Sequence, residues 1–337
     1  MLQSTSIIRV VQIGLGPIGV STTRYLLEHP RLRIVGALDS DPAKQGKDLG
    51  ELAGVPSLGL PIGGSLDDYP PETADTAVVT TTSSLERLAP LLRDLTARQW
   101  NTVSSCEELS FPWLRHPELS RELDGGARKH DVSILGTGIN PGFLMDLLPL
   151  ALTGISQKVE RIAVERVQDA GLRRVPFQHK IGAGLDAAQF KALVAKGLMG
   201  HVGLTESMQM VAQQLGWRLD RTTDEIEPIL ASGPVTGGDQ PISEGKATGL
   251  LQTGRGFVGK KEVIHLLFRA SVGEPRSFDR IRIEGIPNLD FVAEGGINGD
   301  VGTIAVLVNS IPRVQTARAG LLTMPDLAPV TWFGGTP

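Results

Sequence analysis

Short apolar runs rich in β-branched residues recur through the first 140 residues of the chain, and longer stretches with an apolar face separate them. Apolar runs of this length are typical of strands buried on both faces of a parallel sheet. We expect strands at residues 7–13, 32–38, 76–80, 102–105 and 132–136 and helices at 20–28 and 85–98. Strands that alternate with helices predict an α/β fold with a doubly wound parallel sheet.

The pattern changes after residues 140–142, where the sequence reads Asn-Pro-Gly. Polar and apolar positions then alternate over 159–167, as in a sheet with one face in water. Further strands are expected at 263–271 and 279–284, and helices at 189–193, 206–215 and 300–311. This half is predicted to be an α+β domain on an open sheet, and its apolar last helix is expected to return to the first domain. We place the first domain at 1–142 plus about 300–337 and the second at 143–299.

Length and composition agree with two globular domains. The chain has 337 residues, against a usual ~100–200 residues per domain. Hydrophobic residues make up 41%, charged residues 21%, and the net charge is -4, so nothing indicates disorder or a basic surface for nucleic acid or an anionic membrane. The first ten residues lack a signal-peptide pattern, and no apolar run reaches the roughly 20 residues that span a bilayer. We therefore expect a cytoplasmic protein.

The single cysteine, Cys106, excludes an internal disulfide framework and fits a reducing compartment. The 6 histidines show no metal-ligand spacing. No metal site is expected.

Gly14, Gly16 and Gly19 form a GxGxxG motif between the first predicted strand and the first helix, and Asp39 ends the next strand 20 residues further on (39 − 19). This context is the dinucleotide-binding fingerprint of a Rossmann domain. The first glycine permits a tight turn, the second lets the backbone approach a pyrophosphate, and the third lets helix and strand pack closely. The alternative is a glycine-rich turn without a ligand. The residues expected at the cofactor here are Gly14, Gly16, Pro17, Ile18 and Gly19.

The residues after the second strand bear on the choice of cofactor. Asp39 would accept hydrogen bonds from the adenosine ribose, which favours NAD. Ser40, Lys44 or Lys47 could instead pair with the 2′-phosphate of NADP, although these lysines can equally belong to a solvated helix face. NAD, NADP or both therefore stay open.

Hydroxyl side chains follow the third predicted strand, at the edge where doubly wound sheets bind ligands. Thr80, Thr81 and Thr82 are expected to line the nicotinamide ribose. Capping of the next helix by Ser83 or Ser84 is the structural alternative, and both can hold at once.

Two adjacent acids, Glu107 and Glu108, follow Cys106 at the end of the fourth strand, and Cys106 itself is expected among the cofactor-binding residues. A carboxylate beside a nicotinamide, partly desolvated, would have a raised pKa and could act as a general acid or base. The other acid would then be stabilised by the positive end of a helix that starts here. Alternatively, both acids are surface charges. No histidine is paired locally with Cys106, so a nucleophilic role for this thiol has no support.

Two further clusters are candidates for substrate contacts. The loop at 136–143 includes Asn140, expected at the cofactor, and Phe143, which with Met145 could form an apolar wall. In the second domain, Lys180 could bind a carboxylate and His179 could carry a proton. The alternatives are that the loop at 136–143 is only a hinge, that Phe143 and Met145 are ordinary core residues, and that His179 and Lys180 lie on an exposed loop. The candidate pocket residues are Phe143, Met145, Gln168, His179 and Lys180.

These segments resemble the native amine dehydrogenases, which are related to 2,4-diaminopentanoate dehydrogenase within the dihydrodipicolinate-reductase-like group. The resemblance spans nearly the whole chain. It is carried by GLGPIG, LDSDPAKQGKDLGELAG, SSCEELSFPW, GTGINPGFLMD, RRVPFQHKIGAGL and GGINGDVGT.

The resemblance implies a Rossmann domain, a C-terminal α+β domain that forms a homodimer interface, and reversible NAD(P)-dependent reductive amination of small ketones or aldehydes by ammonia. It also implies that one glutamate of the CEEL motif is the catalytic acid/base, and we take Glu108 before Glu107. The loop at 140–143 should help to form the substrate pocket.

The chain departs from true dihydrodipicolinate reductases, because QHKIGAGL replaces their paired-histidine HHxxKxDxPSGT stretch. This argues against a dipicolinate substrate. A diamino acid dehydrogenase remains the main alternative, since Arg173, Arg174 and Lys180 could bind a substrate carboxylate. A carbonyl or imine reductase without free ammonia and a nonenzymatic dinucleotide sensor are the other hypotheses.

Overall fold

The computed structural model describes residues 6–171 and 173–334 of the chain. They fold into two compact units, and each is described by itself. Unit 1 contains the residues up to Phe143 together with those from Gly299 onwards, and unit 2 contains Leu144–Asn298.

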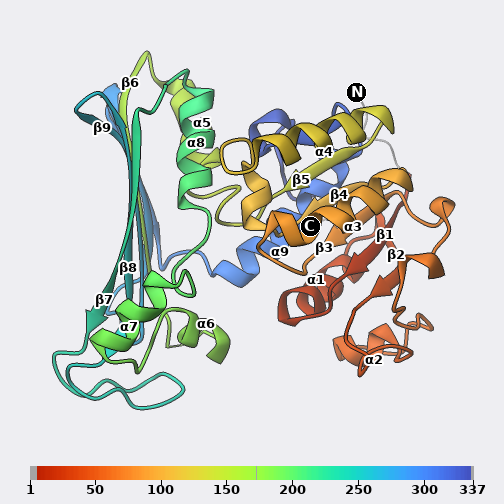
Figure 1. Cartoon of the computed structure of the whole chain (residues 1–337), viewed down its shortest axis with the longest axis horizontal. Coiled ribbons are helices and arrows are strands. Elements are labelled where there is room, and N and C mark those ends of the chain that lie inside the picture. Colours follow the sequence, from red (N-terminus) through yellow and green to blue (C-terminus); the bar gives the residue numbers. More distant parts are fainter. Residues whose placement is uncertain (1–5, 172, 335–337) are drawn as a thin grey trace. The chain divides into compact units, whose positions relative to one another are not determined.

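Unit 1 is built on a six-stranded sheet with the order β12-β5-β4-β3-β1-β2, in which every pairing is parallel (Figure 1). Its strands are β1 (Ile8–Ile13), β2 (Leu32–Leu38), β3 (Thr76–Val79), β4 (Asn101–Ser104), β5 (Ser133–Gly136) and β12 (Gly320–Leu322). Strand β1 pairs with β2 on one side and β3 on the other, so the chain reverses its direction of winding there. Doubly wound sheets bind ligands at the carboxyl ends of strands at such a point.

Helices flank this sheet. They are α1 (Pro17–Leu27), α2 (Leu49–Ala53), α3 (Leu85–Ala97), α4 (Pro117–Lys129) and α9 (Gly299–Val314). Helix α3 packs with α4, and α1 packs with α9. The leucines of α3 at 85, 88, 92 and 95 are fully buried, which is the three-to-four-residue spacing of one helical face.

Unit 2 is built on a second six-stranded sheet with the order β11-β10-β6-β9-β8-β7. Its strands are β6 (Lys158–Asp169), β7 (Arg221–Leu230), β8 (Ala247–Val258), β9 (Lys261–Ser271), β10 (Phe278–Ile286) and β11 (Leu289–Glu294). The central pair, β6 and β9, is parallel, and the other pairs are antiparallel, so the sheet is mixed.

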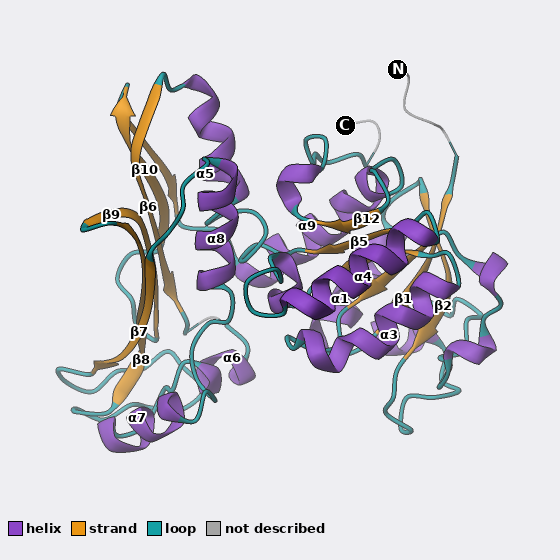
Figure 2. Ribbon diagram, turned by 45° about the horizontal axis from the view of Figure 1, so that its top comes forward, coloured by secondary structure: helices purple, strands orange, loops and turns teal. Residues whose placement is uncertain are grey.

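The helices of unit 2 lie on one side of this sheet (Figures 1 and 2). They are α5 (Leu147–Leu152), α6 (Val175–Lys180), α7 (Ala187–Ala195) and α8 (Leu204–Gln214). Ile162 and Val164 of β6 share an apolar cluster with Met208 of α8. The intervening residues of β6 point to the other face, where Arg161 pairs with Glu262 and Glu165 pairs with Arg282. One face is therefore an apolar core and the other a layer of ion pairs.

The structure confirms the predicted α/β fold class and finds every strand and helix that the sequence analysis named, with ends shifted by a few residues. It also contains strands that the pattern did not predict, above all β7 and β8. Among the described residues, no helix is long and apolar enough to cross a membrane. In the same part of the chain, no three His, Cys, Asp or Glu side chains are grouped to hold a metal ion.

Candidate active site

The glycine turn after β1 is one of the most tightly packed points of unit 1. A Cβ atom at Gly19 would lie 1.9 Å from the carbonyl oxygen of Gly14, and one at Gly14 would lie 2.7 Å from that of Thr80. Gly14 also has φ +85°, a left-handed conformation that favours glycine. A Cβ atom at Gly16, in contrast, would meet nothing within 4 Å. Gly14 and Gly19 thus serve the protein's own packing, while Gly16 leaves space above the start of α1.

Thr80 holds this turn in place. Its hydroxyl donates a hydrogen bond to the carbonyl oxygen of Gly14 (2.8 Å) and accepts one from the Gln12 amide (2.9 Å). The Gln12 amide also donates to the Gly14 oxygen, at 3.1 Å. The Thr80 side chain is thus a support of the glycine turn, a role the sequence analysis did not foresee, and the buried Gln12 was missed entirely.

The other hydroxyls of this loop are arranged differently. Thr81 is exposed, and the Thr82 hydroxyl accepts a hydrogen bond from the Ser84 N–H at 3.2 Å. Ser84 is the N-cap residue of α3, but its side chain makes no capping hydrogen bond. The carboxylate of Glu108 caps the helix instead, because it accepts the N–H of Leu85 at 2.8 Å.

Asp39 lies beside the glycine turn. Its carboxylate accepts hydrogen bonds from the N–H groups of Leu15 (2.7 Å) and Asp41 (2.9 Å) and from the ammonium of Lys44 (3.0 Å). Burial alone would raise the pKa of Asp39, but these hydrogen bonds and the charge of Lys44 outweigh it, so the pKa is lowered. Asp39 is therefore an anion near neutral pH. The Lys44 ammonium lies beside it, where the 2′ substituent of a bound ribose is expected.

These residues line a pocket with a volume of about 400 Å³ at the carboxyl ends of β1, β2 and β3. Gly14, Gly16, Thr80 and Thr81 line it, and Asp39 and Ser40 supply polar groups. Leu38, Leu66 and Leu91 add apolar surface. A pocket with an apolar wall, a carboxylate and free N–H groups at a helix start fits an adenosine with its pyrophosphate. Pro17 and Ile18 form the first residues of that helix.

The two acids after β4 lie in very different surroundings. Glu108 accepts hydrogen bonds from Leu85 N–H, from the Arg115 guanidinium (3.0 Å) and from His116 Nε2 (3.3 Å), so its carboxylate joins the starts of α3 and α4. For Glu107, the described residues provide a hydrogen bond only to its backbone oxygen, from Ser110. The carboxylate of Glu107 is half-buried and is the less constrained of the two.

Cys106, just before this pair, is buried, and its thiol lies 3.2 Å from the carbonyl oxygen of Ser83. Burial raises the pKa of this thiol to about 12, so it stays protonated and does not act as a nucleophile. Asn140 and Phe143 are half-buried and lie close to the end of β5 in the same unit.

Unit 2 contains a buried cation that the sequence analysis missed. Arg166 of β6 is 2% exposed; its Nη2 donates to the carbonyl oxygen of Ile297 (2.6 Å), and its Nη1 lies 3.4 Å from Asp279. Gln168 donates to the same Ile297 oxygen (2.7 Å) and accepts a hydrogen bond from Arg173 (3.0 Å). Burial lowers the pKa of Arg166 to about 10, which still leaves it charged at neutral pH.

His201 is half-buried beside this group of cations. Burial lowers its pKa to about 3, and the positive charges of Lys180 and Arg166 act in the same direction. His201 is therefore neutral at physiological pH. We call Arg166, Arg173, Lys180 and His201 the basic cluster. The sequence analysis named Arg173 and Lys180 of this cluster as possible carboxylate ligands, but not Arg166 or His201.

The remaining predicted pocket residues of unit 2 differ in their exposure. His179 and Lys180 lie exposed at the end of α6, while Gln168 is buried beside Arg166. Met145 is buried in the core with Ile162 and Met208, which is the core alternative for this residue.

Replacing Gly19 and Gly16 by alanine separates protein packing from ligand binding. We expect Gly19→Ala to lower the free energy of unfolding by about 1–3 kcal/mol and to weaken NADH binding, because its Cβ would collide with the Gly14 carbonyl. Gly16→Ala should leave stability unchanged but raise the Kd for NADH at least about tenfold, because its Cβ would enter the space of the pyrophosphate. Urea unfolding and fluorescence titration measure both. Unchanged NADH binding by Gly16→Ala would rule out this position for the pyrophosphate.

The half-buried His201 should make the protein less stable in acid. Its pKa is about 3 when folded and near 6.5 when unfolded, so the unfolded chain takes up the proton first. Stability is retained above pH 6.5 and falls toward pH 3, by up to about 1.4 kcal/mol per pH unit. His201→Gln should flatten this slope in urea unfolding, whereas replacement of the exposed His179 by Gln should not. Equal slopes in all three proteins would contradict the assignment.

Comparisons with known proteins agree with this architecture. Residues 143–335 match the family model of the 2,4-diaminopentanoate dehydrogenase C-terminal domain. A 2,4-diaminopentanoate dehydrogenase of Acetoanaerobium sticklandii is 32% identical over 335 residues, which cover 95% of this chain and 93% of the relative. An amine dehydrogenase of Streptomyces virginiae is 23% identical over 95% of this chain and 96% of its own length.

Solved structures with similar folds include the amine dehydrogenase from Mycobacterium smegmatis, with a TM-score of 0.86 and 24% identity over 99% of this chain and 100% of the other. The dipicolinate-bound dihydrodipicolinate reductase from Paenisporosarcina sp. has a TM-score of 0.52 and 14% identity over 95% of this chain and 98% of the other. The resemblance from which the sequence analysis argued is thereby confirmed. The chain belongs to the 2,4-diaminopentanoate dehydrogenase family of NAD(P)-dependent dehydrogenases.

Proposed function

We propose that the protein is an NAD(P)-dependent dehydrogenase that oxidatively deaminates a small amino compound with a carboxylate, as in a diamino acid, and catalyses the reverse reductive amination with ammonia. The observation that carries this substrate class is the basic cluster of unit 2. The relative named 2,4-diaminopentanoate dehydrogenase supports the same class.

The charges of the basic cluster argue for an anionic substrate group. Arg166 is buried, and Asp279 is the carboxylate paired with it. Arg173 carries a second positive charge, which repels that of Arg166 and lowers its pKa. Lys180 carries a third positive charge near His201. Arginine matches the two oxygens of a carboxylate, so these cations fit a substrate carboxylate.

Unit 1 supplies the residues for the cofactor. The glycine turn, the free space at Gly16 and the anionic Asp39 fit an NAD, and Lys44 beside Asp39 also fits the 2′-phosphate of NADP. When bound, the nicotinamide supplies the hydride acceptor in deamination and the hydride donor in amination.

Proton transfer is the task that this chain's own side chains perform. We assign it to Glu107, because Glu108 already accepts three hydrogen bonds that join α3 and α4. In deamination, Glu107 would accept a proton from the substrate ammonium, so that the neutral amine can lose its hydride. It would release this proton to solvent, then take a proton from the water that attacks the iminium ion and pass that proton to the amino group, which departs as ammonia. This proposal changes the order in which the sequence analysis ranked the two acids.

Separate replacement of the two glutamates tests these roles. We expect Glu107→Gln to lower kcat by about 10²–10⁴-fold without a change in Tm or in the Kd for NADH. Glu108→Gln should lower the free energy of unfolding by about 1–3 kcal/mol and reduce kcat far less. The reverse pattern would make Glu108 the acid/base.

A substrate panel tests the proposed activity. NAD(P)H oxidation with small ketones and keto acids should require ammonium, and 2,4-diaminopentanoate should be oxidised with a KM at least about tenfold below that of 2-aminopentane. In Arg173→Gln this preference should be lost, while kcat/KM for 2-aminopentane stays unchanged. Oxidation of NAD(P)H by ketones without ammonium would indicate a carbonyl reductase instead.

Equal use of both amines would favour the second candidate, an amine dehydrogenase for small ketones and aldehydes that has no carboxylate requirement. The names of the relatives from Streptomyces virginiae and Mycobacterium smegmatis support this candidate.

We also propose that the chain forms a homodimer, as the family resemblance implies. The face of the unit 2 sheet without helices offers paired charges such as Arg255 with Glu225 and Arg161 with Glu284, which a second copy could cover. Sedimentation should give a mass near twice 36.0 kDa. A mass of one chain at micromolar concentration would contradict this proposal.

A further inference from the structure

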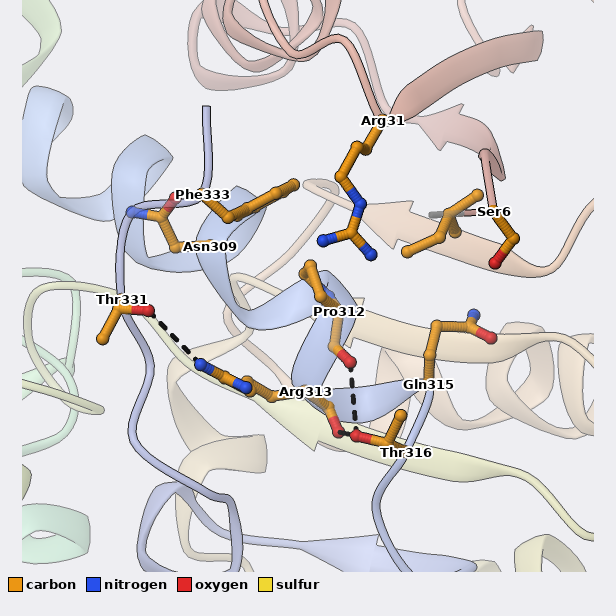
Figure 3. A pocket seen from close by; sticks show the side chains of 10 residues that line it. Ser6, Arg31, Asn309, Pro312, Arg313, Gln315, Thr316, Thr331 and Phe333 are labelled. Carbon is orange, nitrogen blue, oxygen red and sulfur yellow. Dashed lines mark hydrogen bonds between the residues drawn. The ribbon is translucent and has the colours of Figure 1, made fainter. Parts of the chain in front are cut away.

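Unit 1 has a cavity at each edge of its sheet. Besides the pocket at the glycine turn, a cavity of about 260 Å³ is lined by Ile8, which begins β1, and by Arg313, which donates to the Thr331 hydroxyl (Figure 3). Since Ile8 lies at the amino-terminal end of its strand and doubly wound sheets bind ligands at the carboxyl ends, the adenosine belongs in the pocket at the glycine turn. The charges around that pocket then determine which dinucleotide it accepts.

The pocket at the glycine turn presents a negative charge to the ribose. NADP differs from NAD only in a 2′-phosphate, and a phosphate monoester carries a charge of about −1.5 to −2 at pH 7. Among the described residues that line the pocket, Asp39 is the one with a charged side chain. The nearby lysines, Lys44 and Lys47, are not among these lining residues, and Lys47 is exposed.

By its position Lys44 could reach a 2′-phosphate, but two carboxylates already share its ammonium. Its Nζ lies 3.0 Å from the carboxylate of Asp39 and 3.8 Å from that of Asp41. The N–H of Lys44 donates to the carbonyl oxygen of Asp41 at 3.0 Å, so a turn of the backbone brings the ammonium back between the two acids. One cation shared by two anions leaves a negative charge beside the 2′ position.

Asp39 retains room for a ribose hydroxyl. A carboxylate has about four acceptor positions, and three are occupied by the N–H groups of Leu15 and Asp41 and by the Lys44 ammonium. The fourth can accept an O–H group of the unmodified ribose. A 2′-phosphate would instead bring anionic oxygens against this carboxylate.

The segment that carries these charges is held in place by its own backbone. The carboxylate of Asp41 accepts the N–H of Ala43 at 3.0 Å. Beyond the turn, Gly46 donates to the carbonyl oxygen of Ile62, and Ile62 donates to that of Lys47, both at 2.9 Å. Asp41 therefore cannot withdraw from an incoming phosphate without the loss of hydrogen bonds.

We propose that unit 1 selects NAD over NADP, with Asp41 as a specificity-determining residue that repels the 2′-phosphate and Lys44 as the counter-ion of Asp39 and Asp41. The inference rests on the cofactor site of the proposed function and does not depend on the substrate. Binding of the dinucleotides alone, without an amine, therefore tests it.

The first test is fluorescence titration of the full chain with NADH and with NADPH over a range of sodium chloride concentrations. We expect the Kd for NADPH to exceed that for NADH at least about tenfold at low salt, because like charges repel. Salt screens this repulsion, so the ratio of the two Kd values should fall as salt is added. If Lys44 bound the phosphate, salt would weaken NADPH selectively and the ratio would rise.

Two charge-removing variants localise the effect. Asp41→Asn keeps an acceptor for the N–H of Ala43 and should lower the Kd for NADPH at least about threefold, while the Kd for NADH stays within about twofold. Asp131→Asn is the matched control, because Asp131 is exposed and precedes β5 at the opposite edge of the sheet. It has φ +56°, which asparagine also adopts, and it should leave both Kd values unchanged.

Three results would overturn the proposal: NADPH that binds as tightly as NADH, a ratio that rises with salt, or an equal response of the ratio to the two variants. Each of these would leave the proposed enzymatic activity intact. Binding of neither dinucleotide would overturn the proposed function together with this inference.

Discussion

The contact of the Gly14 carbonyl with the backbone of Gly19 is the constraint on which the nucleotide unit depends. No side chain fits between these two residues, so the first helix starts directly against the first strand. Three side chains fix the turn from different strands: Gln12 from within β1, Asp39 from the end of β2 and Thr80 from the end of β3. The binding surface for a dinucleotide is thereby a property of three neighbouring strand ends and not of the glycine motif alone.

The second unit differs from the first in that it contains a charged side chain in its core. It places a guanidinium inside its core, pairs it with one aspartate, and surrounds a neutral histidine with further positive charge. The opposite face of the sheet pairs arginine with glutamate. There, water lowers the energetic cost of a charge that lacks a close partner. An arginine–carboxylate pair is thus buried on the core face of this sheet and partly exposed to water on the other.

The elements that depend on local pattern could be predicted from the sequence. The strands of unit 1 are continuous apolar runs, and the glycines of its first turn have the spacing that the fingerprint requires. Strand β8 escaped prediction because three glycines, at 249, 254 and 256, interrupt its apolar positions. In the structure Gly254 faces Leu204 and Met208 of α8, where a Cβ atom would come within 3.2–3.4 Å. Strand β7 is rich in acids and contains Pro228, which is tolerated because the strand lies at an edge of the sheet.

Candidate chemistry was harder to predict than the fold. Adjacent glutamates look equivalent in a sequence, and only the distances from Glu108 to the starts of α3 and α4 distinguish them. Arg166 could not be identified because a charged residue in a strand normally faces water. Its burial depends on Asp279 and Ile297, more than 100 residues further along the chain.

The return of α9 and β12 to the first unit affects the order in which the protein can assemble. Helix α1 packs with α9, and β5 pairs with β12, yet both partners follow the whole of unit 2 in the chain. On the ribosome, the sheet of unit 2 can therefore be complete while β5 still has an open edge and α1 still lacks its neighbour. Synthesis of the chain therefore starts with unit 1, but unit 1 can complete its fold only after all of unit 2 has been made.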